Sequence, residues 1–293
     1  MAPAETPLAE LVAARAAHSY SMNGTHDKSG HQQMNTSTAN PDEISQFARL
    51  AEKWWDADGE FRPLHQLNPA RLGFICNCLY THFDLNPVSK RPLQGLSLID
   101  VGCGGGLLTE PMCRLGATVT GIDAGAETID AARHHAEAVG LDINYRHTLP
   151  EDIDHVRQKF DVVLNMEVVE HVADRALFLK IAANLVKPGG AMVLSTLNRT
   201  LKSLALAKIG AEYVFRWLPA GTHDWRNFVR PSELANDLEP HGMTLRKLTG
   251  LTYSPIDETW RESRDLDINY MMFTTKAALG TSTYPQGNSI QEK

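Results

Sequence analysis

The chain has 293 residues, 43% of them hydrophobic and 22% charged, which is enough for one large α/β domain with appended segments. Its formal net charge of -7 argues against nucleic acid as a partner, because phosphate binding needs a basic face. Four cysteines without CxxC spacing favour reduced thiols in the cytoplasm, and no apolar run reaches the roughly 18 to 20 residues that span a bilayer.

The two ends of the chain are predicted to be flexible tails. Residues 1–41 are rich in small and polar residues, with little aromatic content and no sustained periodicity. They lack the apolar core of a signal peptide and the Arg-rich, acid-poor character of an organelle transit peptide. Residues 277–293 are expected to be equally unstructured, which leaves 42–276 as the folded domain.

Two helices are predicted before the first strand. Residues 44–55 carry apolar side chains at three- and four-residue steps, including Trp54 and Trp55. Such a stripe is typical of a helix that packs against the main domain. A proline-containing stretch over 61–69 then leads into a second helix over 70–83.

Residues 96–115 are predicted to form a strand, a glycine-rich loop and a helix. An apolar run over 96–101 ends in a glycine-dense turn, and apolar residues at helical spacing follow over 107–115. Gly102 and Gly104 lack the Cβ atoms that would keep a ligand away from the backbone. A ligand can therefore contact the main chain here.

The residues around this loop favour S-adenosylmethionine over a dinucleotide. The next strand, 118–122, ends at Asp123, about the right distance along the chain for an acid that binds a ribose. Leu107 stands where a dinucleotide-binding loop has its third glycine. Asp100 would repel a pyrophosphate but favours the amino group or sulfonium of S-adenosylmethionine. A purely structural role in ordering the loop is the alternative for Asp100.

Strands and helices continue to alternate along the chain. The expected elements are helix 127–139, strand 143–146, strand 160–166, helix 176–185, strand 191–196 and two final strands over 245–253 and 267–275. Alternation of this kind predicts a parallel sheet with right-handed crossovers. The expected fold is α/β and Rossmann-like, a mostly parallel seven-stranded sheet with an antiparallel edge hairpin and helices on both faces.

The end of the strand over 160–166 carries the candidate chemistry. Met166 is placed to lie against an adenine ring, although ordinary core packing explains it equally well. Glu167, Glu170 and His171 stand at i, i+3 and i+4, so a helix beginning here would present all three on one face. They could bind Mg²⁺ or another divalent cation, and His171, assisted by Glu170, could act as a general base. Alternatively, the acids cap a helix and the histidine belongs to the core.

Residues 197–230 are predicted to be an insertion that contacts a membrane or covers the substrate. Six basic residues stand against two acidic ones, mixed with leucine and aromatic residues. This composition suits an amphipathic helix on an anionic phospholipid surface. A helix that simply packs on the domain is the open alternative.

Taken together, these motifs resemble those of the UbiG family, the ubiquinone-biosynthesis O-methyltransferases, which are class I S-adenosylmethionine-dependent enzymes. The resemblance covers about residues 42–276. It is carried by KWWD at 53–56, GEFRPLH at 59–65, LNPARLG at 67–73, DVGCGGG at 100–106, EVVEH at 167–171, STLNR at 195–199, GAEY at 210–213 and GTHD at 221–224.

The resemblance implies methylation of a hydroxyl of 2-polyprenyl-6-hydroxyphenol and of 3-demethylubiquinol. It places donor contacts at Arg71, Gly102, Asp123 and Met166, and a divalent cation at the acidic motif 167–171. It also implies a bacterial, cytoplasmic protein peripheral to the membrane through 197–230, with contacts to other ubiquinone biosynthesis proteins left open.

Three other functions remain open at this point. A C-methyltransferase of the same fold would methylate a ring carbon of a quinone precursor and could dispense with a metal. A lipid-binding protein could retain the donor fold without turnover. A nicotinamide-dependent oxidoreductase is disfavoured by Leu107 and Asp100.

Overall fold

The computed structural model describes residues 37–40, 44–45, 50–205 and 225–278. The chain divides into two units, Met1–Thr36 and Ser37–Lys293, and every described residue belongs to the second. Most of the predicted tails and residues 206–224 of the predicted insertion therefore lie outside the described residues. Their expected roles stay predictions.

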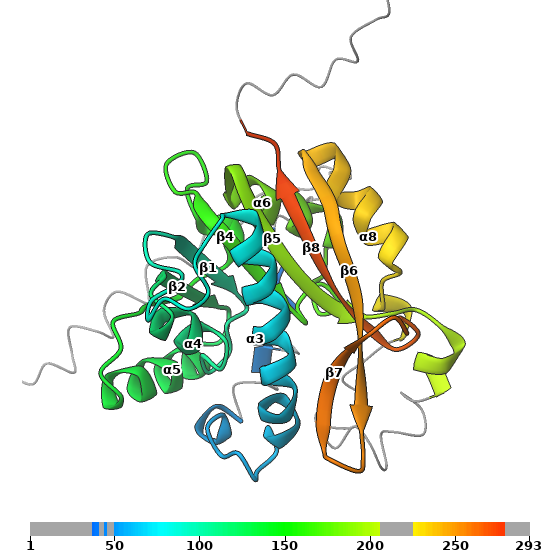
Figure 1. Ribbon diagram of the computed structural model, residues 1–293, viewed down its shortest axis with the longest axis horizontal. Helices are drawn as coiled ribbons and strands as arrows, with labels where there is room; N and C mark the ends of the chain where they lie inside the picture. Colours follow the sequence, from blue (N-terminus) through cyan, green and yellow to red (C-terminus); the bar gives the residue numbers. More distant parts are fainter. Residues whose placement is uncertain (1–36, 41–43, 46–49, 206–224, 279–293) are drawn as a thin grey trace, which may run out of the picture. The chain divides into compact units, whose positions relative to one another are not determined.

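The fold is built on an eight-stranded sheet in the order β3-β2-β1-β4-β5-β8-β6-β7 (Figure 1). The strands are β1 (Ser97–Val101), β2 (Thr118–Asp123), β3 (Asn144–His147), β4 (Phe160–Met166), β5 (Val186–Leu197), β6 (Met243–Ser254), β7 (Thr259–Ser263) and β8 (Asn269–Lys276). The first five are mutually parallel, whereas β8 pairs antiparallel with both β5 and β6. The predicted α/β class and antiparallel edge are confirmed.

The edge of the sheet differs from the prediction in two ways. The prediction had seven strands, and the strand it lacked is β7, which forms a hairpin with β6. This strand is short and mostly exposed, so its sequence carries no apolar run. The last predicted strand, β8, does not lie at the edge, because it inserts between β5 and β6.

After the first strand, three helices match the prediction and α8 was not predicted; before that strand, the helices differ from the prediction. They are α3 (Arg62–His82), α4 (Thr109–Arg114), α5 (Ala126–Ala138), α6 (Arg175–Leu185) and α8 (Pro231–Leu238), with single 3₁₀ turns at Ala51–Lys53 (η1), Pro150–Asp152 (η2), Trp225–Asn227 (η3) and Glu239–His241 (η4). α3 begins eight residues before the predicted start, with a proline in its first turn, where the missing N–H is not needed, and a second, Pro69, inside it. In the described part of 44–55, the predicted helix is reduced to residues 44–45 and η1.

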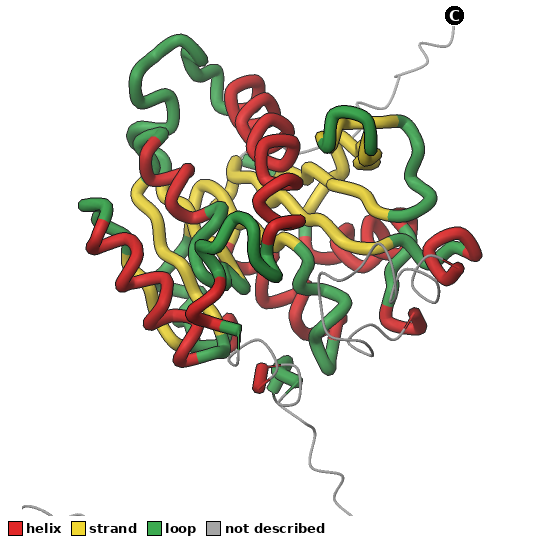
Figure 2. Tube along the Cα trace, turned by 90° about the horizontal axis from the view of Figure 1, so that it is seen from below, coloured by secondary structure: helices red, strands yellow, loops and turns green. Residues whose placement is uncertain are grey.

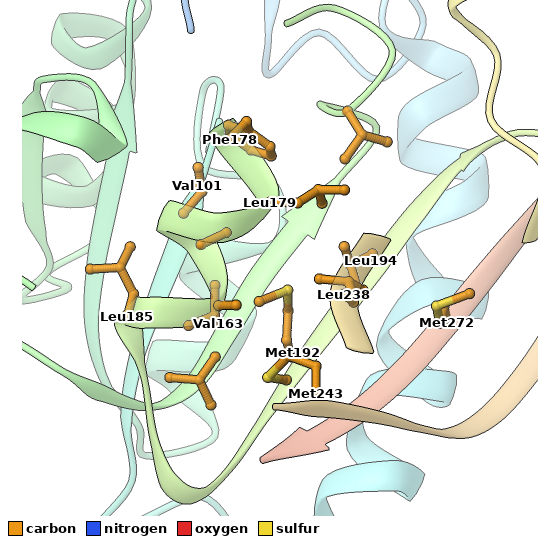
Figure 3. Close-up of a cluster of buried hydrophobic side chains, with 14 of the residues drawn as sticks. Val101, Val163, Phe178, Leu179, Leu185, Met192, Leu194, Leu238, Met243 and Met272 are labelled. Carbon is orange, nitrogen blue, oxygen red and sulfur yellow. The ribbon is translucent and has the colours of Figure 1, made fainter. Parts of the chain in front are cut away.

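Two hydrophobic layers lie on the two faces of the sheet. Successive strand residues point to opposite faces, so Val163 packs with α6 and α8 whereas Val162 and Leu164 pack with α3. Figure 2 shows helices on both sides of the strands. Figure 3 shows Leu179 of α6 and Leu238 of α8 in the layer that contains Val163. Burial on both faces explains why the central strands β1, β4 and β5 each carry an apolar run.

No helix in the described part of the chain is both long and apolar enough to cross a membrane.

Candidate functional site

The glycine-rich loop follows β1 at the carboxyl end of the sheet, where open α/β folds bind ligands. The backbone N–H groups of Gly102 and Cys103 both donate to the carbonyl of Ile122, at 2.9 and 3.0 Å, which ties the loop to β2. Gly104 has a φ of +53°, and a Cβ there would lie 2.5 Å from the Trp54 ring. This position therefore requires glycine both for its conformation and for the close approach of the indole.

Asp123 joins this loop to the one after β2. Its carboxylate accepts hydrogen bonds from the backbone N–H of Gly104 at 3.1 Å and of Gly125 at 2.8 Å. Burial raises the pKa of Asp123 above its ordinary value, although these backbone donors act in the opposite direction. The structure thus places Asp123 beside the loop, as its spacing from Gly102 predicts.

Asp100 is a buried carboxylate at the end of β1, with 2% of its surface exposed. The Thr109 hydroxyl donates to it at 2.7 Å. Burial raises its pKa to about 7, although the Thr109 hydrogen bond and the charge of Arg71 both lower it. The surrounding residues therefore stabilise the negative charge only in part.

Arg71 reaches the same end of the sheet from α3. It is 5% exposed and forms an ion pair with Glu167, which also accepts a hydrogen bond from the Ser195 hydroxyl at 2.7 Å. Glu167 has a φ of +53°, an unfavourable conformation for a residue with a side chain, and its N–H donates to the Ser195 carbonyl. Met166 is buried beside them, with its sulfur 3.7 Å from the Ser195 hydroxyl.

Glu170 is also buried, but on the other face of the sheet. It is 3% exposed and accepts a hydrogen bond from the Thr196 hydroxyl at 2.8 Å. Burial raises its pKa to about 6, while the neighbouring His171 lowers it. Glu170 and His171 thus interact electrostatically, and His171 is partly exposed.

The predicted helix beginning at Glu167 does not form. Residues 167–173 make turns, and α6 begins only at Arg175, where the Asp174 side chain caps it by accepting from the Leu177 N–H. Glu167 and Glu170 instead bind Ser195 and Thr196, which are consecutive on β5 and so point to opposite faces. The two carboxylates therefore diverge.

This divergence does not support the predicted metal site at Glu167, Glu170 and His171. Among the described residues, no three His, Cys, Asp or Glu side chains are grouped so that they could hold a metal ion. Glu167 is already engaged by Arg71 and Ser195. In this arrangement the motif does not fit a divalent cation.

Several site residues were missed by the sequence interpretation. The hydroxyl groups of Ser195, Thr196 and Thr109 donate hydrogen bonds to the carboxylates of Glu167, Glu170 and Asp100, respectively. Trp54 lies against the glycine loop rather than only in the core. The two β5 residues could have been found from position, because they end a strand at the ligand-binding edge. The contact of Trp54 is long-range and has no local signal.

Comparison with known proteins agrees with this geometry. A family model described as a methyltransferase domain matches residues 99–194. The ubiquinone biosynthesis O-methyltransferase of Paramagnetospirillum magneticum is 52% identical over 239 residues, covering 82% of this chain and 96% of the relative. The protein of the same name from Brucella anthropi is 52% identical over 241 residues, covering 82% of this chain and 97% of the relative.

Solved structures support the fold. A magnesium protoporphyrin IX methyltransferase from Synechocystis, with S-adenosylhomocysteine bound, aligns with a TM-score of 0.54 at 20% identity over 74% of this chain and 86% of its own. An S-adenosylmethionine-dependent methyltransferase from Clostridium acetobutylicum gives a TM-score of 0.54 at 13% identity over 80% of this chain and 99% of its own.

The family resemblance and the expectation that S-adenosylmethionine is the methyl donor are therefore confirmed. The fold is that of S-adenosylmethionine-dependent methyltransferases, and the near full-length identity to the two relatives is far above the level at which only a fold is shared. The chain belongs to the ubiquinone biosynthesis O-methyltransferase family and is an S-adenosylmethionine-dependent enzyme.

Proposed function

We propose that this enzyme transfers the methyl group of S-adenosylmethionine to a ring hydroxyl of 2-polyprenyl-6-hydroxyphenol and of 3-demethylubiquinol. The observation that carries this proposal is the convergence of the glycine loop, Asp100 and Asp123 at one edge of the sheet, in a chain about half identical to relatives named for this pathway.

The donor is bound by residues at the ends of β1, β2 and β4. Asp123 accepts hydrogen bonds from the ribose hydroxyls, Met166 packs against the adenine, and the loop at Gly102 and Gly104 contacts the methionine part through its backbone. Asp100 supports this arrangement because its charge is only partly stabilised by the protein, and a cationic ligand would complete it.

Arg71 completes the donor site from α3. Its Nε is buried and has no hydrogen-bond partner among the residues that the structure describes. A ligand carboxylate is the natural acceptor for this N–H, since guanidinium groups bind carboxylates through more than one donor. Arg71 therefore recognises the amino-acid end of the donor while Glu167 holds its guanidinium in place.

The acceptor needs a base. A phenol has a pKa near 10 and is a poor nucleophile until it loses its proton. His171 takes that proton while the oxygen attacks the methyl carbon, the carbon–sulfur bond breaks, and the sulfonium becomes the neutral thioether of S-adenosylhomocysteine. Glu170, in electrostatic contact with His171, stabilises the imidazolium that forms.

The divalent cation expected from the resemblance has no part in this proposal, since its expected ligands diverge. The proposal does include attachment to an anionic membrane through 197–230, which suits an acceptor with a long isoprenoid tail. The local excess of basic residues supports it, as does Leu201, which is 80% exposed at the start of this segment. Peripheral location at the bacterial cytoplasmic membrane and contacts with other biosynthesis proteins belong to the same proposal.

The test is a coupled assay of S-adenosylhomocysteine release with short-chain versions of both acceptors, with and without EDTA. Turnover of both acceptors that survives EDTA is expected. Binding of S-adenosylhomocysteine without turnover of either acceptor would contradict the proposed reaction. Flotation with vesicles of phosphatidylcholine alone or with phosphatidylglycerol tests the membrane contact, and equal recovery in both would contradict it.

A further inference from the structure

The glycine loop is covered by a neighbouring pair of tryptophans. Trp54 is buried against the loop, so that a Cβ added at Gly104 or at Gly105 would lie 2.5 Å from its side chain. The indole N–H of Trp55 donates to the Gly105 carbonyl at 3.0 Å. The segment around η1 is thus bound directly to the main chain that contacts the donor.

The position of this segment depends on a second element, α5. The ring of Trp55 stacks on that of His135 with centroids 3.5 Å apart and planes inclined by 6°. His135 Nδ1 in turn donates to the Glu110 carboxylate at 2.6 Å. Glu110 lies at the start of α4, directly after the glycine loop, so the chain of contacts begins and ends at the loop.

Glu110, which binds His135 of α5, is unusual because it is a buried acid. Its side chain is completely buried, and its other oxygen accepts a hydrogen bond from Arg114 at 2.9 Å. Burying a carboxylate costs free energy unless hydrogen bonds satisfy it. Glu110 therefore favours the orientation of the imidazole that keeps this hydrogen bond. A fixed imidazole gives Trp55 a rigid surface to stack on.

One polar atom of the tryptophan pair also lacks a hydrogen-bond partner among the described residues. The Trp54 indole N–H is buried and has no hydrogen-bond acceptor among the residues that the structure describes. It belongs to the side chain that lies against Gly104 and Gly105. A buried donor at this position favours a ligand acceptor there, because an unsatisfied N–H costs free energy.

The geometry points to His135 as a positioning residue for the methyl donor: held by Glu110, it fixes Trp55, which closes the tryptophan pair over the donor loop. His135 does not contact the reacting atoms. Its effect is on donor affinity, not on methyl transfer, and it leaves the acceptor site unchanged. The inference rests on the donor site of the proposed function.

The test compares His135→Ala with His134→Ala, a neighbouring exposed histidine on the same helix that serves as the matched control. Loss of the stack is expected to raise the Kd for S-adenosylhomocysteine and the KM for S-adenosylmethionine about tenfold, equivalent to about 1.4 kcal/mol. Acceptor KM and kcat should stay within about twofold. His135→Phe, which keeps an aromatic ring for the stack but loses the hydrogen bond to Glu110, should recover only part of the affinity.

Trp55→Phe guards against a folding defect in His135→Ala, since it keeps a stacked ring and removes only the hydrogen bond to Gly105. It is expected to weaken S-adenosylhomocysteine binding about threefold to tenfold. Calorimetric affinities equal to the control in both variants would overturn the inference, as would a fall in kcat at unchanged donor KM. Failure of the unaltered enzyme to bind S-adenosylhomocysteine would instead refute the donor site itself.

Discussion

Replacing Asp100 by asparagine should stabilise the fold and weaken donor binding. Asp100 is buried at the end of β1, and its pKa rises from the ordinary value of 3.8 to about 7. At 1.36 kcal/mol per pKa unit, this rise corresponds to about 4 kcal/mol of lost stability above neutral pH. A buried asparagine amide that lacks an acceptor costs about 1 to 3 kcal/mol, so we expect a net gain of about 1 to 3 kcal/mol at pH 8.

The gain should depend on pH in a defined direction. Below pH 4 Asp100 is protonated in both the folded and the unfolded chain and contributes nothing. Between pH 4 and about 7, Asp100 is ionised in the unfolded chain but still largely protonated in the folded one. The unsubstituted enzyme therefore loses stability relative to Asp100→Asn as pH rises. The difference between the two proteins is complete only above pH 7.

Urea unfolding of both proteins at pH 5 and pH 8 measures this difference, because the other titrating groups are common to both. Calorimetry with S-adenosylmethionine at pH 8 should show an affinity at least tenfold lower for the variant, since a cationic ligand loses its buried counter-charge. A variant less stable than the native enzyme at pH 8, or one that binds the donor equally well, would refute the reasoning.

Two further substitutions test other parts of the site, and a third tests the stability of the fold. His171→Ala should lower kcat at least a hundredfold without changing S-adenosylhomocysteine affinity, because it removes the base; turnover within threefold of native would exclude that role. Arg71→Lys should raise the KM for S-adenosylmethionine about tenfold, because an ammonium lacks the planar fork, and an unchanged donor KM would argue against the contact. Thr38→Val should lower the free energy of unfolding by about 1 to 2 kcal/mol, because the buried Thr38 hydroxyl donates to Glu151 at 2.8 Å; equal urea midpoints would contradict this.

The central strands were predictable because burial on both faces leaves an unmistakable apolar run. The strand at Phe160–Met166 was predicted to the residue, and the β1 and β2 boundaries to within one. The edge strand β7 was not, because its side chains are mostly exposed and polar. The hydrophobic pattern of the sequence reveals only strands that are buried. An exposed strand such as β7 forms because it pairs with a neighbouring strand, which the local sequence does not reveal.

The site was predictable where it depends on local sequence and not where it depends on contacts across the fold. Asp100 and Asp123 end adjacent parallel strands, so their placement beside the glycine loop follows from chain order. The spacing of the motif 167–171 suggested a helix, but hydrogen bonds to Ser195 and Thr196 of β5 hold it in turns. The stack of Trp55 on His135 joins residues 80 positions apart and left no local signal.

The most direct test of the assigned reaction is the position of the transferred methyl group. Purified enzyme is incubated with S-adenosylmethionine labelled with ¹³C in the methyl group and a short-chain demethylubiquinol, and the product is examined by NMR. We expect a single labelled methoxy carbon and one equivalent of S-adenosylhomocysteine. A label on a ring carbon, or no labelled product from an enzyme that binds the donor, would contradict O-methylation.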